Sequence, residues 1–356
     1  MHTHDDWRLQ LKTSIRTPKA LREAISLTLQ EEAALVLLEQ KGGLPLGITP
    51  HFLSLMDLNN ENDPLRLQMV PRVAEFAPGL IERRDPLGEE DHEVVPNLVH
   101  RYPDRVLLLI TDRCGSYCRF CTRKRWVGQG PSPQKNHLDQ ALWYIENHPE
   151  VKEVLVSGGD ALLLDDDSLK SILARLRAIP SVDIIRLATR LIVFAPTRVT
   201  QGLIEILKAH QPVFIMSHIN HPNELDEKAK AAILALSDNG IPVYNQTVLL
   251  KGVNDDAKVL SALFRELTKL RARPYYLHQC DIAPGTAQFR VPIDNALNLV
   301  GQLRGHISGL SMPTFALDIP GGFGKVSLVP NPIVDRDENF VYLKGFDGEV
   351  AKYPVT

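Results

Sequence analysis

The sequence predicts an α/β fold, a partial (βα)6 barrel of TIM type with an N-terminal helical region before it and a further segment after it. The first observation is that short apolar runs with β-branched residues alternate six times with amphipathic stretches of helical length. The second is that the connecting loops are short, which favours parallel strands joined by right-handed helical crossovers. The third is that glycine and chemically reactive residues follow the predicted strands, where such barrels place their chemistry.

The expected strands and helices follow one another from residue 106 to residue 278. Strands are predicted at 106–110, 154–156, 184–188, 213–216, 243–250 and 273–278, and helices at 138–147, 167–178, 201–210, 226–239 and 258–270. The first hundred residues are expected to be helical and irregular, with helices at 18–40, ended by Gly42 and Gly43, and at 65–77, and with a polar loop at 82–91. We divide the chain into an N-terminal helical region (1–95), the partial barrel (96–310) and a C-terminal segment (311–356).

Composition narrows the class of protein. The 356 residues are 44% hydrophobic, enough for one large core or two modest ones, and the formal net charge of -3 gives no reason to expect nucleic acid as a partner. No apolar run is long enough to cross a bilayer, so no membrane association is expected. The polar, acidic residues 1–6 are unlike a secretory signal, and a cytoplasmic location is the expectation.

Three of the four cysteines lie close together in the chain. Cys114, Cys118 and Cys121 have the spacing C-x3-C-x2-C directly after the first predicted strand. Three thiolates on one loop can bind three irons of a [4Fe-4S] cluster and leave the fourth iron open, which is where S-adenosylmethionine (SAM) would chelate. A structural zinc site is the alternative, but it normally has four ligands. Cys280 stands alone, and we expect it to be a buried apolar residue.

A glycine-rich turn follows the second predicted strand. It consists of Ser157, Gly158, Gly159 and Asp160. Glycines at such a position allow the backbone to approach a ligand closely, although the pattern alone is weak because many turns share it. Together with the cysteine loop, the turn resembles the segment of the radical SAM superfamily that binds the amino group of SAM.

Longer motifs resemble one family within that superfamily, lysine 2,3-aminomutase. They are HRYPDR at 100–105, CTRKR at 121–125, NHPNE at 220–224, NQTVLLKGVND at 245–255, RGH at 304–306 and PGGFGK at 320–325. The resemblance extends from about residue 7 to residue 353. It implies an enzyme that uses SAM, a [4Fe-4S] cluster and pyridoxal 5'-phosphate (PLP), and that receives an electron from a donor such as flavodoxin or ferredoxin.

The resemblance assigns Lys325 as the residue that binds PLP covalently, although a lysine after glycines is by itself more often part of a surface loop. It makes Arg101 and Arg105 the clamp for the PLP phosphate, with Gln246 in the same pocket. Two guanidinium groups four residues apart suit a phosphate dianion. A surface salt-bridge pair is the alternative for the two arginines. Arg190 is assigned by the same resemblance to SAM binding.

The substrate-binding residues come from the same resemblance. Arg123 would bind the substrate carboxylate, and Asp281 and Asp318 would hold the ε-ammonium group of L-lysine. Two carboxylates at the distal end of a site select a long cationic amine. The glutamate-specific relatives do not keep this acidic pair, and a turn or capping role is the alternative for each aspartate. His218, which follows the fourth predicted strand, would bind SAM.

The implied activity is a radical 1,2-amino shift that interconverts L-α-lysine and β-lysine, which is an isomerase reaction. The alternatives are the aminomutase that makes β-lysine for elongation factor P, and a glutamate or other amino-acid 2,3-aminomutase. A non-enzymatic iron-sulfur sensor is a third alternative, but it would need neither Lys325 nor the arginine clamp. No cysteine follows Cys280, so the zinc-binding interface of longer family members, and the homo-oligomer it supports, are in doubt. Phe323 interrupts the glycine run that the family carries before its PLP lysine.

Overall fold

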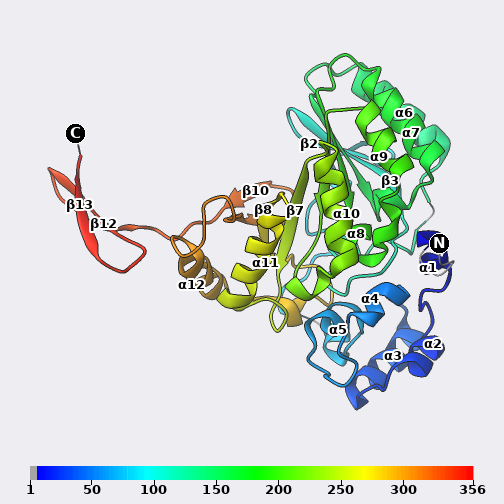
Figure 1. The fold of residues 1–356 in the computed structure, drawn as a ribbon, viewed down its shortest axis with the longest axis horizontal. Coiled ribbons are helices and arrows are strands. Elements are labelled where there is room, and N and C mark those ends of the chain that lie inside the picture. Colours follow the sequence, from blue (N-terminus) through cyan, green and yellow to red (C-terminus); the bar gives the residue numbers. More distant parts are fainter. Residues whose placement is uncertain (1–5, 78, 131, 356) are drawn as a thin grey trace.

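A single ten-stranded sheet organises the part of the chain that the computed structural model describes, residues 6–77, 79–130 and 132–355. Its strands follow the chain order from β1 to β10, and those from β3 to β9 are parallel (Figure 1). The parallel strands are β3 (Arg105–Thr111), β4 (Glu153–Gly158), β5 (Ile184–Thr189), β6 (Val213–Ser217), β7 (Val243–Leu249), β8 (Ala272–Gln279) and β9 (Thr314–Asp318). The prediction of an α/β fold built on a mostly parallel sheet is confirmed.

Helices connect the parallel strands and cover the sheet. They are α6 (Lys135–Glu146), α7 (Asp166–Arg177), α8 (Leu191–Phe194), α9 (Gln201–Ala209), α10 (Glu227–Asp238), α11 (Ala257–Lys269) and α12 (Ile293–Leu303). The five predicted crossover helices agree with α6, α7, α9, α10 and α11 to within three residues at each end. Helix α11 shows why they form, because its buried residues Leu260, Leu263, Phe264 and Leu267 recur at the spacing of one helix face.

The N-terminal region, drawn in blue in Figure 1, consists of short helices that begin at polar caps. They are α1 (Trp7–Lys12), α2 (Pro18–Ala24), α3 (Leu29–Lys41), α4 (Pro50–Ser54) and α5 (Pro64–Met69). The prediction of one helix over 18–40 was wrong. The Thr28 hydroxyl accepts a hydrogen bond from the Glu31 amide, and the Glu31 carboxylate accepts one from the Thr28 amide. This capping box begins a new helix at Leu29.

The predicted helix over 65–77 is also interrupted. Helix α5 ends at Met69, and a short 3-10 helix follows at Val73–Phe76. Pro71 lies between them, and proline removes a helical hydrogen bond and disfavours the helical conformation of the residue before it. The predicted end of the helix at Gly42 is correct, because α3 ends at Lys41 and Gly42 has a positive φ of 70°.

The prediction that the first hundred residues are only helical and irregular was partly wrong, because this region also contains strands. An antiparallel hairpin of β1 (Glu93–Val95) and β2 (Leu98–Tyr102) adds two strands to the edge of the sheet beside β3. The turn contains Asn97 at a φ of 67°, a conformation that asparagine tolerates better than most residues. The hairpin brings Arg101 to the sheet.

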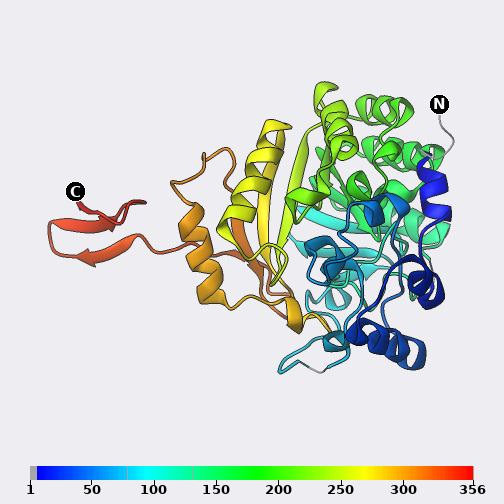
Figure 2. The ribbon, with the colours of Figure 1, turned by 60° about the horizontal axis from the view of Figure 1, so that its bottom comes forward.

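The C-terminal residues form two separate structures. Strand β10 (Lys325–Ser327) pairs antiparallel with β9 and so extends the main sheet. Strands β11 (Ile333–Arg336), β12 (Phe340–Lys344) and β13 (Val350–Pro354) form a small sheet that extends away from the rest of the chain as an arm (Figures 1 and 2). All residues of β11 and β13 are exposed, so this arm has little core of its own.

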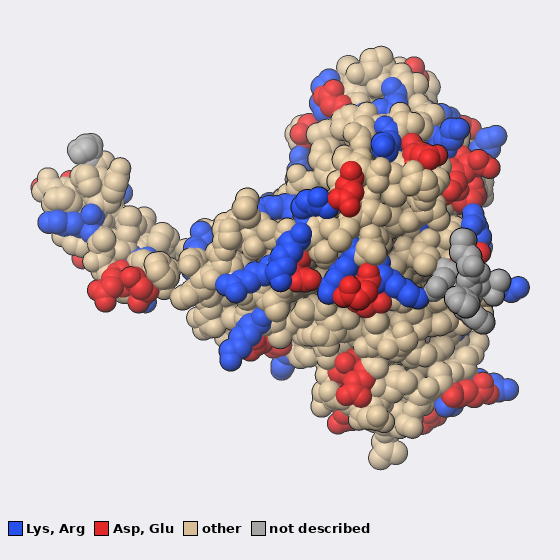
Figure 3. All heavy atoms as spheres, viewed as in Figure 1, with Lys and Arg blue, Asp and Glu red and all other residues tan. Residues whose placement is uncertain are grey.

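Within the described ranges, no helix is long and apolar enough to cross a membrane. On the face drawn in Figure 3, basic and acidic side chains are interspersed. This distribution agrees with the small net charge of the sequence.

Candidate active site at the strand ends

Most of the residues singled out in the sequence lie at the carboxyl ends of the parallel strands. The cysteine loop follows β3, Ser157 and Gly158 end β4, Arg190 follows β5 and His218 follows β6. Gln246 lies within β7, Asp281 follows β8 and Asp318 ends β9. Because the carboxyl ends of parallel strands share one edge of the sheet, the fold gathers these residues on one side. Arg101, Arg105 and Lys325 reach the site differently, from β2, the start of β3 and the start of β10.

The N-terminal region fixes the shape of the cysteine loop. The Tyr117 amide donates to the Gly47 carbonyl at 3.0 Å, and the Arg119 amide donates to the Gln68 carbonyl at 2.8 Å. The Arg119 side chain is fully buried, and its Nε donates to Glu75 at 2.8 Å. A buried arginine is stable only when it is paired, so these contacts hold the loop against the helical region.

The three cysteines of this loop are free and half-buried. Removal from water raises the pKa of each thiol, for Cys121 to about 11, and in Cys114 and Cys121 the charge of a neighbouring cysteine adds to the effect. The Nη1 group of Arg190 donates to Cys118 Sγ at 2.7 Å. A metal ion lowers the pKa of a thiol that it binds, and a nearby guanidinium stabilises the thiolate that results.

No three His, Cys, Asp or Glu side chains of the described residues could together hold a single metal ion. A four-iron cluster makes a different demand, since each cysteine binds a different iron and the three sulfurs need not converge on one point. The donor set therefore fits the cluster that the sequence predicted.

The glycine turn after β4 is packed directly against the backbone that leads into the cysteine loop. The Gly159 amide donates to the Thr111 carbonyl at 2.6 Å, and the Asp160 amide donates to the Arg113 carbonyl at 2.8 Å. Gly158 has a φ of 124°, which residues with a side chain rarely adopt. The glycines are therefore required for close approach between two segments of the protein itself.

Replacing Gly159 by alanine is expected to destabilise the protein. Its Cβ would collide with the Arg113 carbonyl oxygen and also lie 2.9 Å from the Arg113 nitrogen, so backbone would have to move. We expect a loss of about 2–4 kcal/mol in the free energy of unfolding, measured by chemical denaturation. Gly309→Ala is the matched control, because a Cβ added there would have nothing within 4 Å of it. Equal stability of the two variants would contradict this packing argument.

The Asp160 carboxylate links two strand ends. It accepts hydrogen bonds from Thr189 Oγ1 at 2.7 Å, the Arg190 amide at 2.7 Å and the Leu162 amide at 3.0 Å. Its side chain is buried, and removal from water raises its pKa despite these donors. Asp160 thus holds the ends of β4 and β5 together, whereas the sequence suggested only a ligand-binding role.

Arg190 and His218 lie beside the cysteine loop. The Arg190 guanidinium is buried and, besides Cys118, contacts Gln68 at 2.5 Å and Glu224 at 2.9 Å. The His218 ring lies 5.6 Å from the Phe120 ring, which belongs to the loop. Removal from water, followed by the charge of Arg190, lowers the pKa of His218 well below its ordinary value, so this imidazole is neutral at physiological pH.

Lys325 lies among polar side chains at the other end of the site. It is the direct antiparallel partner of Asp318, and its Nζ contacts the Asp318 carboxylate. The same Nζ lies 3.3 Å from His278 Nδ1, and His278 Nε2 lies 2.9 Å from Gln246 Oε1. The side chain of Lys325 is 23% exposed, so the amine remains reachable. Lys325, Asp318, His278 and Gln246 therefore form one connected group.

Tyr102 joins the predicted arginine clamp to this group. The Arg105 and Arg101 guanidinium carbons lie 3.9 Å and 4.9 Å from the centre of its ring. Its hydroxyl accepts hydrogen bonds from the Lys325 amide at 2.9 Å and from Arg101 Nη2 at 3.3 Å. The structure thus brings both arginines and Lys325 around a single aromatic ring. Arg105 also pairs with Asp104 at 2.7 Å, and its side chain is more exposed than that of Arg101.

Two groups connect the cysteine end of the site with the lysine end. The buried Glu89 carboxylate pairs with Arg123, with an Nη2 to Oε1 distance of 2.8 Å, and the charges of Arg123 and Arg125 outweigh burial and lower the pKa of Glu89. In addition to burial, the negative charges of both Asp318 and Glu89 act on the Asp281 carboxyl and raise its pKa. Removal from water and then the charge of Asp318 raise its pKa to about 6.

Sequence reasoning missed Glu89, Tyr102 and His278. Tyr102 lies inside the arginine motif and His278 lies two residues before Cys280, so their positions in the chain were a signal. Glu89 lay in a segment that we interpreted only as a polar loop. Cys280 is buried against Phe289 and other apolar residues, as predicted.

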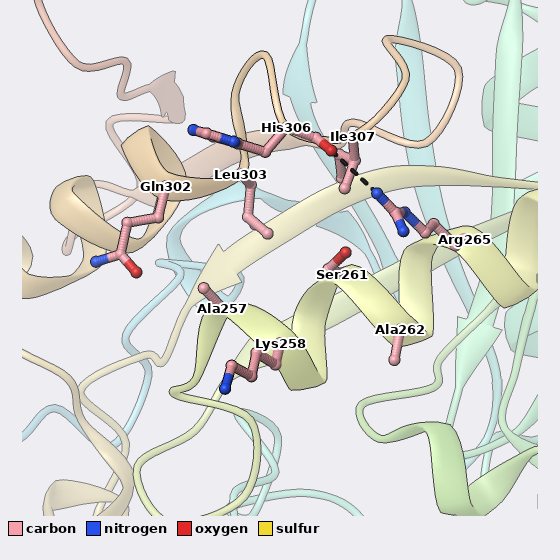
Figure 4. Close-up of a pocket in the computed structure, with 9 residues that line it drawn as sticks. All are labelled: Ala257, Lys258, Ser261, Ala262, Arg265, Gln302, Leu303, His306 and Ile307. Carbon is pink, nitrogen blue, oxygen red and sulfur yellow. Dashed lines mark hydrogen bonds between the residues drawn. The ribbon is translucent and has the colours of Figure 1, made fainter. Parts of the chain in front are cut away.

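A separate groove of about 440 Å³ lies between α11 and α12. Figure 4 shows its lining, in which Arg265 donates to the His306 carbonyl at 3.0 Å. None of its lining residues is one of the site residues described above, so we place the candidate active site at the strand ends and not in this groove.

Comparison with known proteins gives consistent results over 98% of the chain. A family model described as lysine-2,3-aminomutase matches residues 300–356, and a model of the radical SAM superfamily matches residues 108–263. The chain is 44% identical to an L-lysine 2,3-aminomutase of Clostridium subterminale and 45% identical to one of Acetoanaerobium sticklandii; each match covers 98% of this chain and 84% of the relative. It is 38% identical to a glutamate 2,3-aminomutase of Clostridioides difficile, over 98% of this chain and 83% of that protein.

Proposed function

Because this chain belongs to the lysine 2,3-aminomutase family of radical SAM enzymes, and is thus an isomerase of the aminomutase type, we propose that its substrate is L-lysine, which it interconverts with β-lysine. The observation that carries the choice of lysine is the acidic pair Asp281 and Asp318 beside Lys325. A second carboxylate on the substrate side chain, as in glutamate, would be repelled there.

The cysteine end of the site would hold the iron-sulfur cluster and SAM. Cys114, Cys118 and Cys121 are the cluster ligands in this proposal, with Arg190 as a hydrogen-bond donor to one sulfur. When bound and reduced, a cluster at this position would supply the electron for reductive cleavage of SAM. In this proposal His218 and the turn at 157–160 bind SAM, with Asp160 acting through its hydrogen bond to the Arg190 amide at the end of β5. The electron would come from a small donor protein such as flavodoxin or ferredoxin.

The lysine end would hold PLP. Lys325 is the covalent attachment point in this proposal, Arg101 and Arg105 bind the phosphate, and Gln246 lies in the same pocket. PLP supplies a conjugated system that delocalises an unpaired electron. The donors fit a phosphate dianion, since two guanidinium groups lie on one aromatic ring next to the lysine.

Asp318 has two successive partners in this scheme. It now contacts the Lys325 amine, and that amine must lose a proton before it can act as a nucleophile. Asp318 and the neutral His278 are the two groups within reach of that proton. With Lys325 engaged by the cofactor, Asp318 would be available to pair with the ε-ammonium of the substrate. At the opposite end of the substrate, Arg123 would bind the α-carboxylate, and the distance between the two ends selects the length of the amino acid.

The direct test is product formation with two substrates. The protein is reconstituted anaerobically with iron, sulfide and PLP and supplied with SAM, a reductant and either L-lysine or L-glutamate. We expect β-lysine and little β-glutamate, detected by chromatography. β-Glutamate as the main product would overturn the role of the acidic pair, while SAM cleavage with neither product would leave the radical chemistry and remove lysine as the substrate.

Lysine binding is expected to weaken below about pH 6. The pKa of Asp281 is raised to about 6 by burial and then by Asp318, so the carboxyl becomes neutral as the pH falls through that value and no longer attracts an ammonium ion. The dissociation constant of L-lysine, measured by calorimetry between pH 5 and 8, should therefore increase towards tenfold per pH unit on the acidic side.

The stability of the unliganded protein should depend on pH in the opposite direction, and should be greater at low pH. A carboxyl whose pKa is raised in the fold stabilises the protein at low pH, and that contribution is lost as the pH rises through about 6. In Asp281→Asn both dependences should disappear in this range. A wild-type dissociation constant that does not change between pH 5 and 7 would contradict the ionisation of Asp281 as a requirement for binding.

A further inference from the structure

We propose that Glu89 is a positioning residue for substrate recognition, which holds one edge of the Arg123 guanidinium so that the other edge receives the substrate α-carboxylate. The inference rests on the proposed function in one respect, the presence of an amino-acid substrate at Arg123. It does not depend on which amino acid that is, because every α-amino acid carries the same carboxylate.

The hydrogen bonds between the two side chains define which edge is occupied. Arg123 Nε donates to Glu89 Oε1 at 2.9 Å and to Oε2 at 3.2 Å, and Nη2 donates to Oε1 at 2.8 Å. These bonds use the side of the guanidinium formed by Nε and Nη2. A guanidinium has five donors, so Nη1 and the second hydrogen of Nη2 form another edge that can bind a carboxylate with two parallel bonds.

Within the described part of the chain, that second edge of the Arg123 guanidinium makes only a weak hydrogen bond. The Nη1 group has a hydrogen bond to Ser157 Oγ at the long distance of 3.5 Å. Arg123 is 18% exposed at its side chain, while Glu89 is 6% exposed, so the arginine and not the glutamate remains reachable. The arrangement offers an incoming carboxylate an oriented cation with free donors.

Glu89 can orient Arg123 because its own segment is fixed to the PLP end of the site. The residues just before Glu89 contact that end. The Leu87 carbonyl accepts a hydrogen bond from Arg101 Nη1 at 2.8 Å. A Cβ added to Gly88 would lie 2.8 Å from the Gly322 backbone, so the segment is pressed against the glycine loop that precedes Lys325. The carboxylate therefore lies at a fixed distance from the proposed cofactor.

A second cation keeps the Glu89 carboxylate in place. Its Oε2 accepts from Arg125 Nη2 at 3.2 Å, and Arg125 also pairs with Asp85 at 3.5 Å and Glu90 at 3.0 Å. Glu89 thus belongs to a network of alternating charges and does not move freely with the substrate. Without its negative charge, the Arg123 guanidinium would be free to rotate away from the orientation that a carboxylate needs.

The experiment compares two ligands that differ only at the carboxylate, L-lysine and L-lysinamide. Their dissociation constants are measured by calorimetry on the reconstituted holoenzyme without SAM, so that no turnover occurs. In the wild type we expect the amide to bind at least about tenfold more weakly, because it cannot form the charged bidentate pair with Arg123. In Glu89→Gln we expect the affinity for lysine to fall about tenfold. The ratio of the dissociation constant of lysinamide to that of lysine should fall to about two.

The ratio separates positioning from a structural effect. A variant that merely loosened the site would weaken both ligands equally and leave the ratio unchanged, and that result would overturn the proposal. Glu90→Gln is the matched control, since Glu90 lies next in the chain and pairs with Arg125 without contacting Arg123; its ratio should equal that of the wild type. If Glu89→Gln does not fold, Glu89→Asp, which keeps the charge and shortens the reach, should give an intermediate ratio, and a wild-type ratio in that variant would also overturn the proposal.

Steady-state kinetics provide a second readout. Glu89→Gln should raise KM for lysine about tenfold and change kcat by less than about threefold, since uniform substrate binding is what it removes. If the wild type proves to use L-glutamate, the proposed function fails, and the same comparison with glutamate and its α-amide still tests Glu89. The two failures are therefore distinguishable.

Discussion

Cys114→Ala is expected to abolish the cleavage of SAM and to lower the iron content of the reconstituted protein. Each cysteine of the loop would bind a different iron, and loss of one ligand leaves a cluster with two protein ligands instead of three. The two remaining cysteines can bind only two of the irons, so they do not replace the missing ligand. Iron and sulfide analysis, with 5'-deoxyadenosine measured by chromatography, checks the prediction.

Cys280→Ala is the matched control for this variant. Cys280 is also a free cysteine, but it is buried and belongs to the apolar cluster that contains Phe289. We expect it to keep its iron and its SAM cleavage and to lose about 1 kcal/mol of stability from the small cavity left behind. SAM cleavage by Cys114→Ala at the wild-type rate would show that the loop does not carry the radical chemistry.

The sequence was a good guide to the parallel part of the sheet because two local signals agree there. Apolar runs such as 106–110 indicate buried strands, and the helical spacing of Leu260, Leu263 and Leu267 indicates one buried helix face. Since each crossover returns the chain to the same edge, finding the strands was enough to place the cysteine loop, Arg190 and Asp281 on one side.

The sequence was a poor guide where pairing is not local. The hairpin of β1 and β2 and the pairing of Lys325 with Asp318 across β9 and β10 are set by tertiary contacts that no periodicity reveals. The break between α2 and α3 could have been predicted, because Thr28 and Glu31 have the spacing of a capping box. The apolar content of 18–40 outweighed that signal in our prediction.

The same limit applies to the candidate site. Its cofactor residues carried recognisable motifs, but the residues that hold them did not. Glu89 is 34 residues from Arg123 in the chain, and Asp160 contacts Arg190 over 30 residues. Ion pairs between residues so far apart in the chain cannot be predicted from the spacing of motifs, although they decide how the motif residues are oriented.

Lys325→Ala is expected to remove PLP from the protein and to leave the cluster intact. The lysine is the only covalent attachment in the proposal, whereas the cysteine loop is held by contacts to the N-terminal region that this variant does not touch. We expect loss of the visible PLP absorbance, wild-type iron content, SAM cleavage that is retained, and no β-lysine. In the wild type, borohydride reduction followed by peptide mass spectrometry should locate the cofactor on Lys325.

Lys325→Arg separates the loss of the amine from the loss of its charge. Alanine leaves the Asp318 carboxylate without the cation that now contacts it, with Arg101 still 3.5 Å away, so part of the effect of Lys325→Ala could come from a rearranged pocket. Arginine keeps a cation beside Asp318 but cannot act as the nucleophile at neutral pH, because its guanidinium stays protonated. Loss of PLP in both variants would assign the effect to the amine itself, while covalent PLP in Lys325→Arg after borohydride reduction would place the attachment on another lysine.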